Sequence, residues 1–285
     1  MRSALFEMSE NNLSGYSPLP PEEQNMPAVT GPQLDLISSL IYRKFGICMG
    51  KDKYERLALK LADMIHRGFC PDMDELCARL SAGDARCYEQ VAGFVTTCHT
   101  YFFRESEHFK VLASDIRKQR RGGTLIWCAA CSTGEEPYSL AMSLLDEGIS
   151  DFHIVASDVN RTVLEDFNRG VYHEGRFVRT DDAERRRYFT PAGDGFWRID
   201  GSLRKYVSIK NLNLMDTVRF PRPFDYVFCR NVFIYFDDGS RAAALANITA
   251  NMKPGGLLFI GRSEVLLTEP EHLRKAGCSV YCRTA

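Results

Sequence analysis

Apolar positions in the first part of the chain recur every three to four residues, which is the period of an amphipathic helix. Three stretches follow this spacing, namely QLDLISSLIYRKFGI, YERLALKLADMIHRGF and MDELCARLSAG. Each of them ends at a glycine or a turn, as helices commonly do. No segment in this part alternates with period two, so we predict a small all-helical domain over residues 33–100.

The second part of the chain opens with a helical pattern and then changes to an alternation. Residues 105–121 predict a linker helix, which ends at two glycines. Short apolar runs then alternate with helical stretches. The runs are TLIWCAA, FHIVASD, FDYVFCR and GGLLFIG, and the helical stretches include EPYSLAMSLLDEG and RTVLEDFNRG. Such an alternation predicts an α/β domain, with a parallel sheet and helices on both of its faces. We assign residues 101–285 to this domain.

Two segments do not follow these patterns. Residues 172–211 contain several aromatic residues, glycine turns and short period-two pieces such as FWRIDGSLRKYVSI, which predict a small β-rich insertion. Residues 1–32 are rich in Ser, Asn, Pro and Glu and have no apolar core. They predict a flexible tail rather than a secretory signal, with a short docking peptide as the alternative.

Composition and charge narrow the class of protein. Lys and Arg together number 36 against 37 for Asp and Glu, so the chain as a whole does not attract nucleic acid, and we expect no nucleic-acid partner. None of its apolar runs approaches the ~20 residues of a membrane span, so we expect no membrane insertion. The ten cysteines are scattered, mostly among apolar neighbours. This usage indicates reduced thiols in a cytoplasmic protein.

The first candidate for chemistry is the loop CSTGEE, between the first predicted strand and the next helix. In open parallel sheets the ligand lies beyond the carboxyl ends of the strands, near the topological switch point. Gly134 allows close approach of a ligand, but the loop has no phosphate-binding lysine and no further spaced glycines. Its acidic pair would repel a pyrophosphate. The loop therefore suits a ligand with an ammonium or sulfonium group.

The second candidate is Asp158, which ends the next predicted strand, 23 positions after Glu135 (158 − 135). An acid at this place commonly binds ribose hydroxyls. A ribose joined to a cationic head without phosphate describes S-adenosylmethionine. Both acids also have structural alternatives, which are a helix N-cap for Asp158 and a first-turn acid favoured by the helix dipole for Glu135.

Several short motifs follow one another in the order of a known family. They are TYFFRE at 100–105, ACSTGEEPYS at 130–139, ASD at 156–158, NL at 213–214, FCRNVFIYFD at 228–237 and PGGLLFIGRSE at 254–264. The chain in this respect resembles the chemotaxis receptor glutamate methyltransferases (the CheR family) over residues 33–282. The resemblance implies a Rossmann-like, S-adenosylmethionine-dependent methyltransferase domain, with S-adenosylhomocysteine as product. It also implies transfer of methyl groups to glutamate side chains of chemoreceptors.

The resemblance further implies the residues of the cofactor site. Arg104 and Glu135 would face the methionine end, and Arg104 with Tyr235 would lie near the transferred methyl group as the catalytic residues. Asp158 would hold the ribose, and Asn213 with Leu214 the adenine edge. The implied cofactor-binding set is Cys98, Thr100, Arg104, Glu135, Asp158, Asn213, Leu214, Arg230 and Asn231.

These implied roles have plainer alternatives. Arg104 could be an exposed cation of the linker helix, Tyr235 an ordinary packing residue, and Arg230 with Asn231 the polar start of a loop. At Cys98 the family often has Asn, and a thiol is a poor hydrogen-bond donor. One ligand contact is therefore lost at this position or replaced by His99.

The resemblance implies that a basic helix of the helical domain docks on the helical region of the receptor. Lys53, Arg56 and Lys60 share one face by their spacing, although nearby acids offset their charge, and a solvated face is the alternative. Some members of the family also bind a C-terminal receptor tail at the β-rich insertion by strand addition, which the sequence leaves open. We expect a monomer.

Other classes of protein fit less well. Cys128 and Cys131 form CxxC, but a second such pair is missing, because Cys278 and Cys282 are spaced CxxxC. A redox CxxC belongs at a helix start, whereas Cys128 lies in an apolar run, so we predict no metal and no redox site. A dinucleotide-dependent oxidoreductase lacks its glycine pattern. A catalytically weak relative and a methyltransferase for a non-receptor target remain open.

Overall fold

The computed structural model describes residues 27–96, 99–119, 122–266 and 272–284, which divide into two compact units. The first unit contains the described residues up to His99 together with the later segment Tyr235–Ser240. The second contains Thr100–Ile234 and the described residues from Arg241 onward. Residues 1–26, most of the predicted tail, lie outside the described part, as do the last two residues of the predicted linker helix.

The first unit is helical, as predicted, and three of its helices begin at a residue whose side chain caps the helix. Thr30 forms a capping box with Gln33 at the start of the first helix, and Gly46 ends that helix in the left-handed conformation. Asp72 and Asp84 cap the third and fourth helices through their side chains. The elements are α1 (Gly31–Phe45), η1 (Lys51–Lys53), α2 (Tyr54–His66), α3 (Met73–Ser81) and α4 (Ala85–Val95).

The segment Tyr235–Ser240 is part of the first unit although it is remote in sequence. Ile47 and Phe236 form an isolated antiparallel bridge. The backbone N–H of Cys48 donates to the carbonyl of Tyr235 at 2.7 Å, and the Tyr42 hydroxyl donates to the Asp237 carboxylate at 2.8 Å. Periodicity in the sequence does not reveal this association, because it depends on contacts between distant residues.

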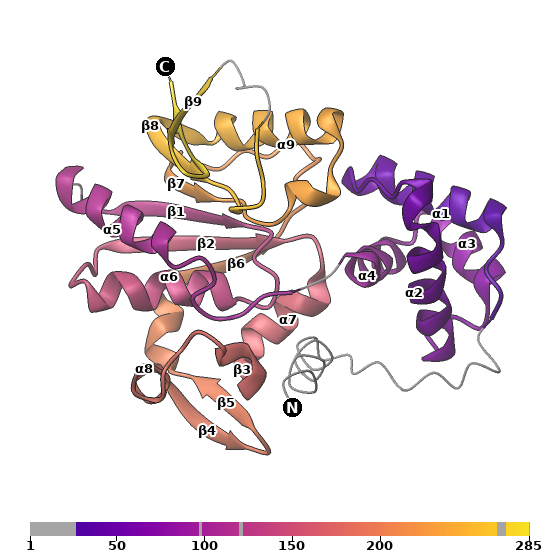
Figure 1. The fold of residues 1–285 in the computed structure, drawn as a ribbon, viewed down its shortest axis with the longest axis horizontal. Helices are drawn as coiled ribbons and strands as arrows, with labels where there is room; N and C mark the ends of the chain where they lie inside the picture. The colour runs from indigo at the N-terminus through magenta and orange to yellow at the C-terminus, as the bar shows by residue number, and fades with distance from the viewer. Residues whose placement is uncertain (1–26, 97–98, 120–121, 267–271, 285) are drawn as a thin grey trace, which may run out of the picture. The chain divides into compact units, whose positions relative to one another are not determined.

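The second unit contains a seven-stranded sheet in the order β6-β2-β1-β7-β8-β10-β9 (Figure 1). Neighbouring strands from β6 to β8 are parallel, as predicted, but β10 is antiparallel to both β8 and β9. The last two strands follow each other within a few residues, and such a short connection allows only antiparallel pairing. The strands are β1 (Thr124–Ala129), β2 (Phe152–Asp158), β6 (Val207–Asn211), β7 (Phe224–Phe228), β8 (Met252–Phe259), β9 (Leu273–Gly277) and β10 (Val280–Arg283).

The strand order reverses between β1 and β7, which makes the carboxyl end of β1 the topological switch point. The α/β class predicted from the alternation is thereby confirmed. The accompanying helices are α5 (Glu107–Gln119), α6 (Glu135–Asp146), α7 (Arg161–Arg169) and α9 (Asp238–Ala250), with the short turn η4 (Phe233–Tyr235).

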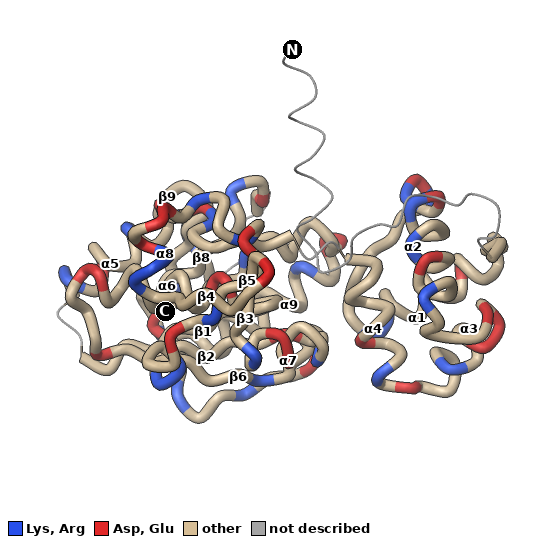
Figure 2. Tube along the Cα trace, turned by 90° about the horizontal axis from the view of Figure 1, so that it is seen from below, with Lys and Arg blue, Asp and Glu red and all other residues tan. Residues whose placement is uncertain are grey.

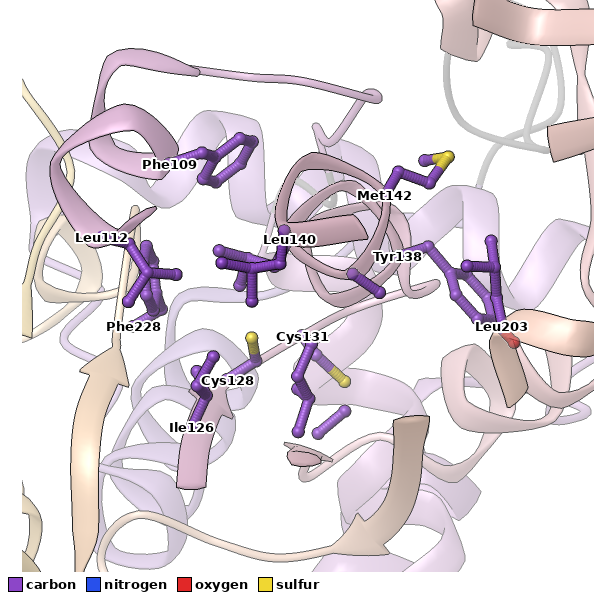
Figure 3. Packing of buried hydrophobic residues seen from close by; sticks show 14 of the residues in the cluster. Phe109, Leu112, Ile126, Cys128, Cys131, Tyr138, Leu140, Met142, Leu203 and Phe228 are labelled. Carbon is purple, nitrogen blue, oxygen red and sulfur yellow. The ribbon is translucent and has the colours of Figure 1, made fainter. Parts of the chain in front are cut away.

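Apolar side chains from α5, α6, β1 and β7 form the core beside this switch point (Figure 3). Leu112, Ile126, Leu140 and Phe228 are fully buried there. Burying a side chain of this size contributes about 1.5–3 kcal/mol. The start of α6 is thus fixed against the sheet by packing, which holds the preceding loop in place.

The β-rich insertion is shorter than the predicted range of 172–211. Its three-stranded antiparallel sheet has the order β3-β5-β4, whereas Val207–Asn211 pairs with β2 as the edge of the main sheet. The period-two pattern indicates a strand there, but it does not show which sheet the strand joins. The elements are β3 (Val171–His173), η2 (Glu174–Phe177), α8 (Asp182–Tyr188), β4 (Phe189–Gly193), β5 (Phe196–Ile199) and η3 (Gly201–Tyr206).

Candidate functional site

The loop between β1 and α6 is a tight turn at the switch point. Ala130, Ser132 and Gly134 all have positive φ, at 58°, 50° and 92°. A Cβ atom on Gly134 would lie 2.2 Å from the ring of Phe167 in α7. The glycine of the CSTGEE motif is therefore required both by its backbone conformation and by the close approach of α7.

Glu135 is the first residue of α6 and is 0% exposed. The Thr133 hydroxyl donates to its carboxylate at 2.9 and 2.7 Å, and Arg176 Nε lies 3.5 Å from Oε1. Burial raises the pKa of Glu135, while Arg176 and Thr133 act in the opposite direction. Glu135 lies in the first turn of α6, where the helix dipole favours an acid, so the structural alternative stated for this residue also applies. A buried carboxylate of this kind is also suited to pair with a cationic ligand group.

Asp158 ends β2 and accepts two backbone hydrogen bonds. The N–H groups of Ser132 and Asn160 donate to it at 2.9 and 3.0 Å. Burial raises the pKa of Asp158, and these donors oppose the shift. The N-cap of α7 is Asn160, whose side chain accepts from Thr162, so the capping alternative for Asp158 is excluded. Each carboxylate oxygen can accept a further hydrogen bond, as ribose hydroxyls would require.

Asn213 and Leu214, which are predicted to contact the adenine, follow β6 and lie next to the end of β2. The Leu212 N–H donates to the Asp158 carbonyl at 3.0 Å, which places this loop beside the end of β2. Asn213 accepts from the Met215 N–H at 3.1 Å within a local turn. Leu214 is 8% exposed, and its carbonyl accepts from the Asn247 side chain at 2.9 Å.

Arg230 lies two residues after the end of β7, and its side chain is only 2% exposed. Its guanidinium is 2.8 Å from Glu136 and 3.1 Å from Glu105, and it donates to the Arg104 carbonyl at 2.6 Å. These partners belong to α6 and to the segment before α5. Arg230 thereby holds the backbone at Arg104, and its contact with the cofactor stays a prediction.

Asn231 has a positive φ of 61°, and its N–H donates to Glu264 at 2.9 Å. The buried Glu264 carboxylate also accepts from the N–H groups of Gly261 at 2.6 Å and Ile234 at 3.3 Å. One side chain thus holds the turn after β8 to the loop after β7. Sequence reasoning did not single out Glu264, although it ends the PGGLLFIGRSE motif.

The segment of Thr100 and Arg104 is fixed by hydrogen bonds to other elements of the second unit. Arg176 Nη1 donates to the Thr100 carbonyl at 2.7 Å. The Phe103 N–H donates to the Ser139 hydroxyl in α6 at 2.9 Å. The Arg104 guanidinium lies 5.9 Å from the centre of the Tyr101 ring. Arg176 was not predicted, because its partners are far away in sequence and no motif marks it.

Two predicted site residues cannot be placed beside the others. Tyr235 belongs to the first unit, where it is half-buried, so its role near the methyl group stays a prediction. Cys98 lies outside the described residues, and the effect of a thiol at this position is untested.

The predicted docking residues differ in their surroundings. Lys53 and Arg56 are exposed, whereas Lys60 is half-buried and donates to the Val95 carbonyl of α4 at 3.1 Å. Figure 2 shows basic and acidic residues interspersed along α2. The exposed Leu59 lies beside Lys60 in the sequence and is 62% exposed.

The CxxC thiols lie in the core of the second unit. Cys128 and Cys131 are buried free thiols, and burial raises the pKa of both well above the usual range. They therefore stay protonated and are poor metal ligands. Among the described residues, no group of three or more His, Cys, Asp or Glu side chains could hold a metal ion. Within the same ranges, no helix is long and apolar enough to cross a membrane.

The chemistry of these donors fits S-adenosylmethionine. Glu135 and Asp158 place two carboxylates after neighbouring parallel strands, one beside a glycine turn and one with free acceptor capacity. The first suits an ammonium group and the second suits ribose hydroxyls. The arrangement would disfavour a pyrophosphate, because both groups carry negative charge.

Comparison with known proteins agrees with this chemistry. Residues 98–282 match the family described as "CheR methyltransferase, SAM binding domain". A chemotaxis protein methyltransferase of Escherichia coli K12 is 36% identical over 256 residues, covering 86% of this chain and 88% of the relative. Chemotaxis protein methyltransferase Cher2 of Pseudomonas putida is 34% identical over 250 residues, covering 82% and 90%. The chain therefore belongs to the CheR methyltransferase family and has its S-adenosylmethionine-binding domain at residues 98–282.

Proposed function

We propose that this methyltransferase transfers methyl groups from S-adenosylmethionine to glutamate side chains of chemoreceptors, forming methyl esters. The observation that carries the proposal is the pair of carboxylates, Glu135 and Asp158, at the switch point of a domain with the family's motifs. The names of the relatives, chemotaxis protein methyltransferases, support a receptor as substrate.

The reaction requires little chemistry from the protein. A glutamate with a pKa of ~4.3 is already ionised at neutral pH, so no general base is needed. S-adenosylmethionine supplies an electrophilic methyl group and departs as a neutral thioether. The protein must orient the two reactants, and correct orientation can contribute ~7–11 kcal/mol.

Each side chain of the site then has a positioning task. Glu135 would hold the ammonium group and Asp158 the ribose, while Asn213 and Leu214 would contact the adenine. Thr100, Arg230 and Asn231 would complete the cofactor site. Arg104 and Tyr235 are the proposed catalytic residues, which would orient the incoming carboxylate or the methionine tail.

For the receptor we propose docking on the exposed face that carries Lys53 and Arg56, with a smaller role for Lys60. These side chains would meet the acidic, helical cytoplasmic region of a chemoreceptor. A receptor tail could add a strand to the sheet of the β-rich insertion, whose Phe196 is 41% exposed. We further propose that the protein acts as a monomer in the cytoplasm.

The test is transfer of labelled methyl from S-adenosylmethionine to a cytoplasmic receptor fragment, scored as base-labile methanol. We expect base-labile label that disappears when the candidate receptor glutamates are replaced by alanine. Label that resists base, or that persists on the alanine fragment, would show that another group is methylated.

A further inference from the structure

Arg176 lies in the β-rich insertion, yet it contacts two parts of the proposed cofactor site. Its side chain is 12% exposed. Nη1 donates to the Thr100 carbonyl at 2.7 Å, and Nε lies 3.5 Å from Glu135 Oε1. The Arg176 carbonyl accepts from the Phe102 N–H at 2.9 Å. The backbone and the side chain of one residue therefore both hold the segment that begins at Thr100.

Tyr172 adds a second link between the insertion and the site. Its hydroxyl donates to the Thr133 carbonyl at 2.9 Å, in the loop between β1 and α6. Its ring packs edge-on against Phe102, with centroids 4.9 Å apart. Phe102 also contacts Phe177 and Phe189 of the insertion, each at 4.9 Å. The insertion, the Thr100 segment and the glycine turn are thus packed together.

We propose that Arg176 is a positioning residue of the methyltransferase, which holds the Glu135 carboxylate and the Thr100 carbonyl in their places for the cofactor. The insertion is then a structural part of the cofactor site as well as a surface for partners. This proposal rests on the proposed role of Glu135. Arg176 acts through Glu135 and Thr100, so we assign it no contact with the reacting atoms.

The physical reason is the burial of Glu135. Arg176 is its basic neighbour within ion-pair distance and Thr133 donates to it, while Tyr172 and Cys131 are the other titratable groups that interact with it electrostatically. Without Arg176, the buried carboxylate would lose its compensating charge and would take up a proton more readily. A protonated Glu135 pairs poorly with an ammonium group, so cofactor affinity would then depend more strongly on pH.

The experiment is calorimetric titration of the full chain with S-adenosylhomocysteine, which reports binding without turnover. Arg176→Gln should weaken binding about tenfold at neutral pH, or ~1.4 kcal/mol. As the pH is lowered, the affinity of this variant should begin to fall at a higher pH than the affinity of the parent protein, because its Glu135 takes up a proton more readily. Arg176→Lys, which keeps the charge, should recover part of the loss. Tyr172→Phe should weaken binding less, because it removes one hydrogen bond to a backbone carbonyl.

Arg187→Gln is the matched control. Arg187 also joins the insertion to α6, through an ion pair with Asp146 at 2.6 Å, but its side chain is 59% exposed. We expect unchanged affinity and an unchanged pH profile. Should Arg176→Gln fail to fold, Arg176→Lys and Tyr172→Phe would decide the question.

Glu135→Gln separates this inference from the proposed function. Weaker binding by Glu135→Gln together with parent-like binding and pH dependence in Arg176→Gln would overturn the role of Arg176 alone. Parent-like binding by Glu135→Gln would refute the placement of the cofactor at Glu135, and the role of Arg176 with it.

Discussion

At the scale of single residues, the two acids of the site are held in different ways. Glu135 has a hydroxyl and an arginine as partners, whereas Asp158 has two backbone N–H groups. The turn before Glu135, whose Ser132 N–H donates to Asp158, leaves no room for a side chain at Gly134. The position of both carboxylates therefore depends on one glycine whose conformation and packing are both demanding.

Replacing Gly134 by alanine should destabilise the protein strongly. The new Cβ would lie 2.2 Å from the Phe167 ring, in addition to the strain of a φ of 92°. Gly148→Ala is the matched control, because Gly148 has a φ of 73° and nothing within 4 Å of its Cβ position. In urea unfolding, we expect Gly134→Ala to lose about 1–3 kcal/mol more than Gly148→Ala. Equal losses would mean that α7 moves away at little cost.

At the scale of elements, loops rather than strands determine the arrangement of the site, and one buried acid joins two of them. Glu264 accepts from backbone N–H groups in the turn after β8 and in the loop after β7. The latter loop begins with Arg230 and Asn231. The shape of this loop therefore depends on the Glu264 carboxylate, although α9 and β8 lie between the loop and Glu264 in the sequence.

Replacing Glu264 by glutamine should lower stability by about 1–3 kcal/mol, because an amide N–H group would then face a backbone N–H donor. Glu107→Gln is the control, since Glu107 is 68% exposed and pairs with Arg262 at 3.6 Å. We expect a loss below ~0.5 kcal/mol for this exposed pair. The two unfolding free energies, measured in urea, should differ clearly. Similar values would show that Glu264 contributes only as a surface charge.

Local patterns predicted the elements well, but not the contacts between distant residues. Helical period and short apolar runs predicted the helical unit and the parallel strands, because these patterns depend on neighbours along the chain. The sheet that Val207–Asn211 joins, the pairing of β10 with β8 and the partners of Arg176 were not predictable in this way. Each of them depends on residues that come together only in the folded protein.

The candidate site was predicted in the same uneven manner. Glu135 and Asp158 were identified from strand ends and spacing, and the remaining positions from the family's motifs. The structure places Arg230 among Glu136, Glu105 and the Arg104 backbone, which no spacing rule indicates. Glu264 and Arg176 were missed, because their hydrogen bonds are made to backbone groups of distant residues, and the motif that ends at Glu264 does not show these partners.

At the scale of the whole molecule, the chain is close to neutral, with 36 basic and 37 acidic residues. Any electrostatic recognition of a receptor must therefore come from a local surface. Lys53 and Arg56 are exposed on the first unit, whereas Lys60 is directed to the Val95 carbonyl. We expect these three residues to contribute unequally.

Replacing both Lys53 and Arg56 by glutamate should raise the KM for the receptor fragment about tenfold, and the effect should diminish at high salt. Binding of S-adenosylhomocysteine should stay unchanged, because neither residue belongs to the cofactor site. Lys60→Glu should have a smaller effect on KM. The control is Arg86→Glu, an exposed basic residue on α4. An equal rise in KM for this control would indicate a general charge effect instead of a docking surface.

The segment Tyr235–Ser240 belongs to the helical unit, and this affects how chimeras between two members of the family should be built. In the helical unit, Ile47 pairs with Phe236, which lies far along the chain. An exchange of only the N-terminal region between two relatives would therefore separate residues that contact each other within one protein. A chimera that keeps this pairing needs three crossover points, so that the donor also contributes the hexapeptide from Tyr235 to Ser240.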